Sequence, residues 1–247
     1  MSSSFQAWLD QFVTEFQLCF INKNRWRMML TGLENTLKIA FFACIIGIAL
    51  GIIFAVIRTT WDTTSGNMRK GPLKTLLRLL NLLGRAYTTV IRGTPMVVQL
   101  MIMYYIIMTN CDDGVLIATI SFGINSGAYV AEIFRAGIMS IEKGQMEAGR
   151  SLGLSYIQTM IYIITPQMIK NVLPTLCNEF ITLLKETSIA GYVAVTDLTF
   201  AGDRIRGATY VAFLPLIVVA IVYLIMVMIL TRLVGLLERR LRKSDGR

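Results

Sequence analysis

The sequence predicts an all-α membrane protein that crosses the bilayer five times. The chain has 247 residues, of which 55% are hydrophobic, and its mean hydropathy is +0.61. This composition is typical of polytopic membrane proteins and not of soluble domains. Several apolar runs are long enough to span a bilayer, and Lys and Arg gather between them, where they hold a membrane protein in one orientation. These loops explain the net charge of +9, so no nucleic-acid partner is expected.

The N-terminal segment, residues 1–31, is expected to lie on the membrane surface. Residues 5–20 carry large apolar side chains at helical spacing, with Asp10, Glu15 and Gln17 elsewhere on the helix. This helix is too polar to span, so we expect it in the interface plane, where it acts as an anchor. The segment also lacks the basic start and the cleavage site of a secretory signal.

The first expected span is residues 37–57, whose length at about 1.5 Å per residue matches a hydrocarbon core of about 30 Å. Gly47 and Gly51 give it a face of small residues that allows close helix contact. The following loop, residues 58–85, is densely basic and is expected to be cytoplasmic, with its leucines on an interfacial helix. Its glycines are spaced as in a phosphate loop, but Pro72 stands where that loop requires Lys. The chain is therefore expected to have no nucleotide site of its own.

The second expected span, residues 86–108, contains the sequence Arg92-Gly93-Thr94-Pro95. Arg92 can extend its side chain toward the cytoplasmic interface. Gly93 and Pro95 are expected to loosen the helix at this point. Tyr105 is a candidate for the substrate path because of its polarity and position.

The third expected span, residues 115–138, has a centre that is too polar to face lipid comfortably. We expect this centre to face the interior of the bundle or a water-filled path. Asn125 and Ser126 are therefore further candidates for the substrate path. Glu132 and Arg135 lie three residues apart on one helical face and are expected to pair.

A polar stretch at residues 147–154 predicts a rigid cytoplasmic elbow between the third and fourth spans. Glu147 and Ala148 suit the first turn of a helix. Gly153 interrupts this helix, since Gly costs about 1 kcal/mol in a helix interior and frees the backbone to bend. A second helix then starts at Leu154 and leads into the next span. Two short helices around a bend form a knob that another protein can grip.

The fourth expected span, residues 160–184, is interrupted by Pro166 and Pro174. Such a helix survives in a membrane only where neighbours or water satisfy its freed backbone groups. Glu179 is the leading candidate for substrate contact, because a carboxylate within a span is costly and marks a functional site by default. It would attract an amino group or a cationic side chain. The open alternative is that Lys170 or a neighbouring helix satisfies Glu179 for purely structural reasons.

The fifth expected span is residues 210–237, preceded by a mixed-charge outer segment at 185–209 and followed by a basic tail that includes residues 242–247. Most of the 24 Lys and Arg residues fall in the regions assigned to the cytoplasm. This bias favours an N-terminus outside and a C-terminus in the cytoplasm.

The chain has no His and four Cys. Catalysis and metal binding by His are therefore excluded, and the Cys residues lack metal-ligand spacing, so neither a catalytic residue nor a metal site is predicted. Cys44 and Cys177 lie in apolar runs and are expected to be buried thiols. Cys19 and Cys111 both fall on the outer side, where pairing between them is left open.

Several of these motifs together resemble a known family. Glu147-Ala148-Gly149, followed by Gly153 and Pro166, resembles the coupling loop of importer permeases of the ATP-binding-cassette (ABC) class. The chain departs from that loop only in having Gly149 for its second Ala. The runs that resemble the polar amino-acid branch of these type I importers are 92–100, 125–132, 178–181 and 184–188.

The resemblance covers about residues 32–241 and implies a five-span type I ABC importer permease with a cytoplasmic coupling helix. It implies that the chain lies in a bacterial plasma (inner) membrane beside a second permease chain, identical or related. It further implies two ATP-binding cassette subunits that use ATP and Mg, and an extracytoplasmic binding protein that delivers a polar amino acid. This chain would then hold no cofactor, and ATP hydrolysis would occur in a separate subunit. The residues expected to contact the ATPase are Glu147, Ala148, Gly149, Leu152, Gly153 and Leu154.

Two other functions stay open at this point. Broken helices and buried acids also suit an ion-coupled secondary carrier, which transports without an ATPase, although obvious paired repeats are missing. A membrane anchor for a cytoplasmic partner is the second alternative, but it would not need polar interiors in its spans. The residue patterns also leave the amino acid open among arginine, histidine, lysine, glutamate, glutamine and cystine.

Overall fold

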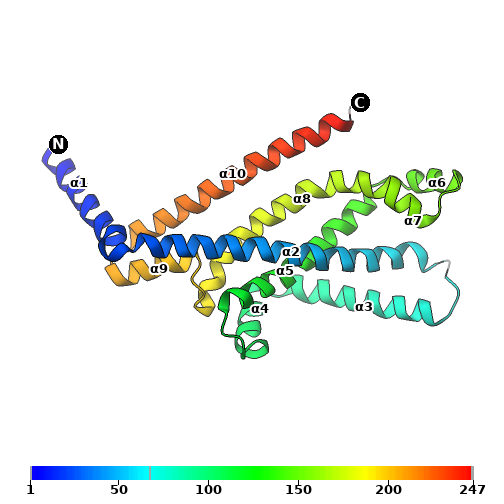
Figure 1. Ribbon diagram of the computed structural model, residues 1–247, viewed down its shortest axis with the longest axis horizontal. Helices are drawn as coiled ribbons and strands as arrows, with labels where there is room; N and C mark the ends of the chain where they lie inside the picture. The colour runs from blue at the N-terminus through cyan, green and yellow to red at the C-terminus, as the bar shows by residue number, and fades with distance from the viewer. Residues whose placement is uncertain (1, 67, 246–247) are drawn as a thin grey trace.

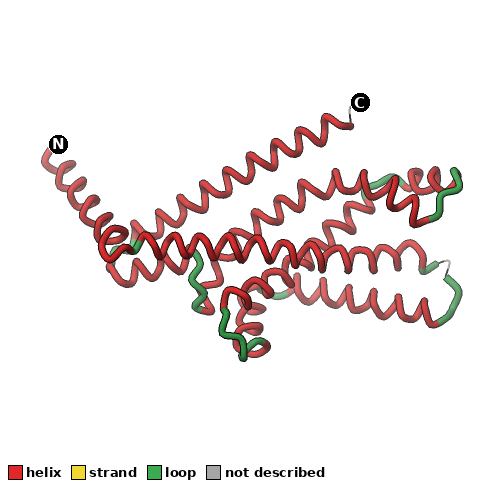
Figure 2. Tube along the Cα trace, in the orientation of Figure 1, coloured by secondary structure: helices red, strands yellow, loops and turns green. Residues whose placement is uncertain are grey.

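The computed structural model describes residues 2–66 and 68–245, and every regular element in these residues is a helix (Figure 2). The expectation of an all-α chain is confirmed for this part. Three described helices are long and apolar enough to cross a membrane by length and composition: Trp26–Thr64, Gly114–Met139 and Phe213–Leu241. The bent helix pair Pro72–Gly93 and Met96–Ile107 meets the same criterion when taken together. The expected fourth span is present as a helix but is more polar than these.

The N-terminal helix α1, Ser2–Phe16, projects from one end of the bundle (Figure 1). The rings of Phe5, Trp8 and Phe12 follow one another along it, with centroids 6.0 and 5.8 Å apart. A π-helical turn and a 3-10 turn then redirect the chain into α2, Trp26–Thr64. The expected surface segment 1–31 therefore includes the start of α2 as well as α1.

Helix α2 has 39 residues and extends past the expected span 37–57 at both ends. Its small residues face α5, Gly114–Met139, along much of its length. A Cβ at Gly47 would lie 3.0 Å from the Ser126 side chain, and a Cβ at Gly51 would overlap Val130. The expectation that these glycines allow close helix contact is confirmed.

The second span differs from the single helix expected over residues 86–108. Helix α3, Pro72–Gly93, ends at a sharp break, and α4, Met96–Ile102, leaves at an angle of 109° before a π-helical turn that ends at Ile107. Thr94 is extended, with φ −121° and ψ 146°, because a residue before proline avoids the α conformation. The leucines of the 58–85 loop belong to α3, which runs beside α2 (Figure 1).

The third span agrees with expectation within one residue at each end: α5 begins after Asp113, whose carboxylate accepts from the backbone N–H groups of Val115 and Leu116 at 2.9 and 3.1 Å. Helix α6, Lys143–Ser151, and helix α7, Tyr156–Thr159, follow at the end of the bundle opposite α1 (Figure 1). A π-helical turn, Met160–Ile164, then leads into α8, Thr165–Glu186. Pro166 lies in the first turn of α8, where proline is tolerated, and Pro174 lies inside the helix.

Residues 185–209, which are expected on the outer side, form a 3-10 segment, Thr187–Val193, and helix α9, Leu198–Thr209. Helix α9 packs against α2 and against α10, Phe213–Asp245, through a buried apolar cluster that includes Phe20, Leu198, Ile205 and Val219. The start of the last helix at Phe213 lies within three residues of the expected start of the fifth span at 210.

All four cysteines are free thiols in the structure. Cys19 is buried beside Thr209, with its Sγ 3.7 Å from the Thr209 Oγ1, so pairing with Cys111 does not occur here. Cys44 and Cys177 are half-buried, which corrects the expectation that both are fully buried.

Candidate functional site

The elbow, which we define as residues 147–159, is fixed by two helix caps. The first ends α6: the N–H of Gly153 donates to the Arg150 carbonyl at 3.0 Å, and the N–H of Leu154 donates to the Gly149 carbonyl at 3.2 Å. Gly153 has φ +86°, a left-handed conformation that glycine adopts without steric cost. The expected break at Gly153 is confirmed, and its cause is this cap.

The second cap begins α7 and was not anticipated from the sequence. The Ser155 hydroxyl accepts from the N–H of Gln158 at 3.3 Å, and the Gln158 side chain accepts from the N–H of Ser155 at 2.8 Å. A Ser followed three residues later by Gln is the sequence signature of this reciprocal cap. Because both sides of the bend are capped, α6 and α7 hold a fixed angle.

The elbow exposes most of its residues and buries Gly149 and Thr159. Glu147, Ala148 and Gly153 are exposed, Leu154 is half-buried, and the Leu152 side chain is 81% exposed. Gly149 is buried against α7 and the π-helical turn, where a Cβ would lie 2.6 Å from the Thr159 Cγ2. The position of Gly149 suits the packing of the elbow rather than its outer surface.

A hydrogen bond connects the elbow to the rest of the bundle. The hydroxyl groups of Tyr156 in α7 and Thr63 in α2 lie 3.2 Å apart. The same two residues line a cavity of about 570 Å³ together with Glu147 and Met139. The elbow is thus in direct contact with the end of α2, so a displacement of the elbow would also move the end of α2.

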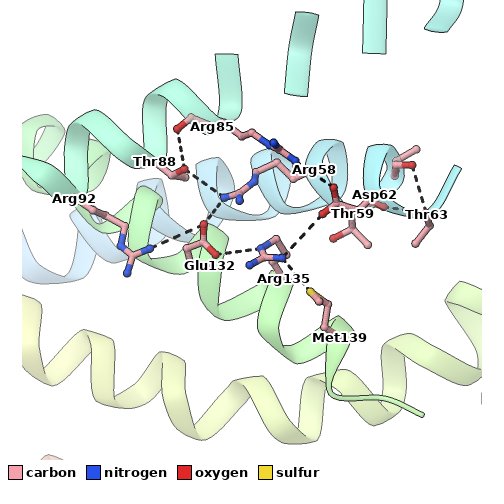
Figure 3. Close-up of polar contacts among 11 residues, drawn as sticks. Arg58, Thr59, Asp62, Thr63, Arg85, Thr88, Arg92, Glu132, Arg135 and Met139 are labelled. Carbon is pink, nitrogen blue, oxygen red and sulfur yellow. Dashed lines mark hydrogen bonds and ion pairs between the residues drawn. The ribbon is translucent and has the colours of Figure 1, made fainter. Parts of the chain in front are cut away.

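Glu132 on α5 gathers three guanidinium groups from three helices (Figure 3). Its Oε1 pairs with Arg58 of α2, and its Oε2 accepts from the Arg135 Nε at 3.1 Å. The Arg92 Nη1 of α3 lies 4.0 Å from Oε1. Arg58 also donates to the Thr88 hydroxyl at 3.3 Å. The expected pairing of Glu132 with Arg135 is confirmed, but it is one part of a larger cluster.

Asp62 is the second carboxylate of this cluster (Figure 3). It lies 3.6 Å from the Arg85 Nη2 and 4.0 Å from the Arg135 Nη1. Four arginines therefore share two carboxylates, and the cluster carries an excess of positive charge. Arg58, Asp62 and Arg85 were assigned only to a basic loop in the sequence. The seven-residue spacing of Arg78, Arg85 and Arg92 could have placed Arg85 on one helix face with Arg92, but no sequence signal places Arg58 and Asp62 beside them.

Two cavities meet at Arg92 and Glu132. One, of about 490 Å³, is lined by these two residues and by Arg58, Arg85 and Thr88. The other, of about 530 Å³, extends along α5 and α8 and is lined by Arg92, Tyr129, Glu132, Ser140 and Glu179, among others. Both volumes lie in the range of about 300–1,000 Å³ that small-molecule sites occupy.

Glu179 projects from α8 into the second cavity and accepts from the Ser126 hydroxyl of α5 at 3.1 Å. No ion pair neutralises Glu179 among the described residues. Lys170 lines a different cavity with Gln167 and Asn171. The structure thus brings Glu179 and Ser126 together, and a structural partnership of Glu179 with Lys170 is not seen in the described part of the chain.

The other two substrate-path candidates lie elsewhere. Asn125 is buried and donates to the Gln99 Oε1 at 3.0 Å. Gln99 in turn donates to the Ile91 carbonyl at 2.7 Å and so braces the break between α3 and α4. Tyr105 is exposed on the π-helical turn after α4 and packs against the ring of Tyr104 at 5.0 Å. Neither residue lines the cavity that contains Glu179.

Residues 47–243 match the model of the family described as "Binding-protein-dependent transport system inner membrane component". The chain belongs to this family. Membership confirms the expected class of importer permeases. It also confirms that this chain is the membrane component and that ATP hydrolysis is the work of a separate subunit.

Curated relatives of this binding-protein-dependent permease cover nearly its whole length. It is 36% identical to the arginine transport system permease protein ArtQ of Bacillus subtilis, over 88% of this chain and 94% of the relative. It is 37% identical to the probable glutamine ABC transporter permease protein GlnM of the same organism, over 90% and 96%. It is 33% identical to the glutamine transport system permease protein GlnP of Escherichia coli, over 87% and 93%.

Solved structures confirm the fold of the permease. A chain in the crystal structure of an amino acid ABC transporter with histidines is 38% identical and superposes with a TM-score of 0.75 over 87% of this chain and 94% of that chain. A chain of the MetNI methionine ABC transporter in an inward-facing conformation superposes with a TM-score of 0.71 at 18% identity, which supports the fold alone. The expected all-α type I importer permease fold is therefore confirmed.

Proposed function

We propose that this permease is the membrane-spanning subunit of an ATP-driven importer that moves a polar amino acid delivered by an extracytoplasmic binding protein. The observation that carries the proposal is the cavity between α5 and α8, which contains the carboxylate of Glu179 within the span. A charged side chain inside a membrane protein is costly and usually serves a polar path. The named relatives and the amino acid transporter of similar structure agree with this substrate class.

Glu179 is proposed to bind the amino group or a cationic side chain of the substrate. Its partner among the described side chains is the neutral hydroxyl of Ser126, so the negative charge is available to a ligand. Ser126 would keep the carboxylate oriented toward the cavity. Asn125 and Tyr105 are proposed only as residues near the path, because they lie outside the cavity that contains Glu179.

The elbow is proposed to couple the permease to its ATPase. Leu152 is the exposed apolar residue at its tip, and Glu147, Ala148, Gly153 and Leu154 surround it. An ATPase that grips this surface would transmit its motion through the capped bend and the Tyr156–Thr63 contact to α2. Gly149 would contribute from inside by letting α6 lie close to α7.

The complete importer is proposed to contain a second permease chain, identical or related, two ATP-binding cassette subunits and the binding protein. ATP and Mg would be used by the cassette subunits. The elbow would face the cytoplasm, the C-terminus would lie inside and the N-terminus would lie outside the inner membrane; the distribution of Lys and Arg supports this orientation. Alternation between two arrangements of the bundle would move the substrate.

The experiment that tests the proposal is purification of the intact complex, followed by mass spectrometry of its subunits and bound ligand. Reconstituted into vesicles with a loaded binding protein, the complex should take up the amino acid only when ATP is present. Uptake without an ATPase would indicate a secondary carrier, and a complex that never transports would indicate an anchor. Glu179→Gln should weaken uptake without affecting assembly, whereas Glu34→Gln, at an exposed ion pair with Lys38, should not.

A further inference from the structure

Arg92 is the least neutralised cation of the cluster on Glu132. The two carboxylate oxygens of Glu132 already pair with Arg58 and with Arg135, and Arg92 approaches Oε1 only to 4.0 Å (Figure 3). Coulomb attraction falls with distance, and one carboxylate offsets one positive charge. The guanidinium of Arg92 therefore retains most of its positive potential.

The position of Arg92 is fixed from two sides. Its guanidinium carbon lies 5.3 Å from the centroid of the Tyr129 ring, within the range of a cation–π contact. Arg92 lies in the last turn of α3, next to the break at Thr94, which Gln99 braces through the Ile91 carbonyl. A planar cation held in this way is suited to binding a carboxylate with two hydrogen bonds.

Arg92 and Glu179 line the same cavity of about 530 Å³. The two residues come from different helices. Within the described structure, Arg92 shares Glu132 with two other arginines, and Glu179 accepts from the neutral hydroxyl of Ser126. A cavity with one cationic and one anionic side chain matches a ligand that carries both charges. A free α-amino acid is such a zwitterion, whereas its α-amide carries no carboxylate.

We propose that Arg92 binds the α-carboxylate of the transported amino acid while Glu179 binds its ammonium group or cationic side chain. This inference rests on the proposed function and assigns to Arg92 a role in selecting free amino acids. Tyr129 orients the guanidinium, and Glu132 prevents it from turning out of the cavity. Recognition of the carboxylate then takes place in the permease as well as in the binding protein.

The test is direct binding to the purified permease–ATPase complex without any binding protein, because a binding protein would impose its own selectivity. The probe is whichever of radiolabelled arginine, histidine, lysine, glutamate, glutamine or cystine the wild-type complex transports. The competitor is the α-amide of the same amino acid. The wild-type complex should bind the α-amide at least about tenfold more weakly, since a charge-assisted hydrogen bond contributes that much or more.

Arg92→Gln should weaken binding of the free amino acid by about tenfold or more and leave binding of the α-amide unchanged, so that discrimination between the two disappears. Arg92→Lys keeps the positive charge and should retain part of the discrimination between the free amino acid and its α-amide. The matched control is Arg78→Gln, which removes an exposed arginine of the same helix that lines neither cavity. This control should discriminate like the wild type. Assembly of each variant is checked by its elution with the ATPase.

Equal affinity of the wild-type complex for the amino acid and its α-amide would overturn the inference, as would undiminished discrimination by Arg92→Gln. Either result would leave the proposed function intact, because the wild-type complex would still transport. A wild-type complex that transports none of the six amino acids would instead contradict the proposed function, and the inference with it.

Discussion

Gly149 lies directly against Thr159: a Cβ at position 149 would come within 2.6 Å of the Thr159 Cγ2 and within 2.9 Å of the Ile163 Cδ1. The contact joins α6 to the helix that follows the bend. It explains why this chain has glycine where the coupling loop that it resembles has a second Ala.

Gly149→Ala should therefore separate α6 from α7 and lower the free energy of unfolding of the complex by about 1–3 kcal/mol. The side chain of Thr159 is stiff and cannot easily move away from the added methyl group. Uptake per ATP hydrolysed should fall as well. Thr159→Ser removes the closest methyl group and should restore part of the loss in the double variant, a coupling that two single variants and one double variant measure. If Gly149→Ala behaves like the wild type, the packing of the elbow is looser than the structure indicates.

Gly153→Ala should destabilise the elbow by about 1–2 kcal/mol, since a residue with a Cβ is strained at a φ of +86°. Gly153→Asn should cost less, because Asn tolerates the left-handed conformation. The backbone amides at positions 153 and 154 donate to the carbonyls of Arg150 and Gly149, so their hydrogen-exchange rates in each variant report the cap directly. Equal exchange rates in the Ala and Asn variants would contradict this account.

Glu132→Gln should destabilise the complex by about 3 kcal/mol, because it leaves the largely buried guanidinium of Arg58 without a counter-charge and leaves Arg135 with only Asp62, 4.0 Å away. Glu34→Gln is the matched control: its ion pair with Lys38 is exposed, so the loss should be about 0–1 kcal/mol. Thermal unfolding of both variants in the same detergent gives the comparison. Similar losses would indicate that the Glu132 cluster is solvated.

Gly51→Ala should destabilise the contact between α2 and α5 by about 1–3 kcal/mol, because the added methyl group would overlap Val130. Val130→Ala in the same chain should recover part of this loss. Gly235→Ala in α10 is the control, since nothing lies near its Cβ and alanine favours a helix. A Gly51→Ala variant as stable as Gly235→Ala would argue against the close packing of α2 on α5.

Asp197 should make stability depend on pH. It precedes α9, outside the spanning helices, and burial raises the pKa of its carboxyl above the ordinary 3.8, although hydrogen bonds from the N–H groups of Thr199 and Phe200 oppose this. The folded state then holds the proton more tightly than the unfolded state. Stability should fall as pH rises from about 3.8 through the raised pKa.

Asp197→Asn keeps a good N-cap for α9 and should remove this slope, so the variant should equal or exceed the wild type in stability near pH 7. Thermal unfolding of the wild type and the variant between pH 4 and 7 measures how the stability of each depends on pH. A wild-type stability that rises with pH in this range, with no change in the variant, would reverse the expected sign.

The sequence was sufficient for features that depend on composition and local chemistry. Apolar runs of spanning length located α2, α5 and α10, and the stop at Gly153 was evident because glycine is costly inside a helix. The pairing of Glu132 with Arg135 followed from helical spacing. Glu179 was identified as a candidate because a carboxylate is unusual within a span.

Only the tertiary structure decided how segments distant in the sequence meet. Gln99 caps the end of α3 through the Ile91 carbonyl, but its own partner is Asn125 of α5, a contact that exists only in the folded chain. Likewise, no local pattern tells that Arg58, 74 residues before Glu132, pairs with it, or that Arg92 shares a cavity with Glu179. The physical reason is that helix formation depends on near neighbours, whereas charge pairing and cavities depend on which faces of the helices pack together.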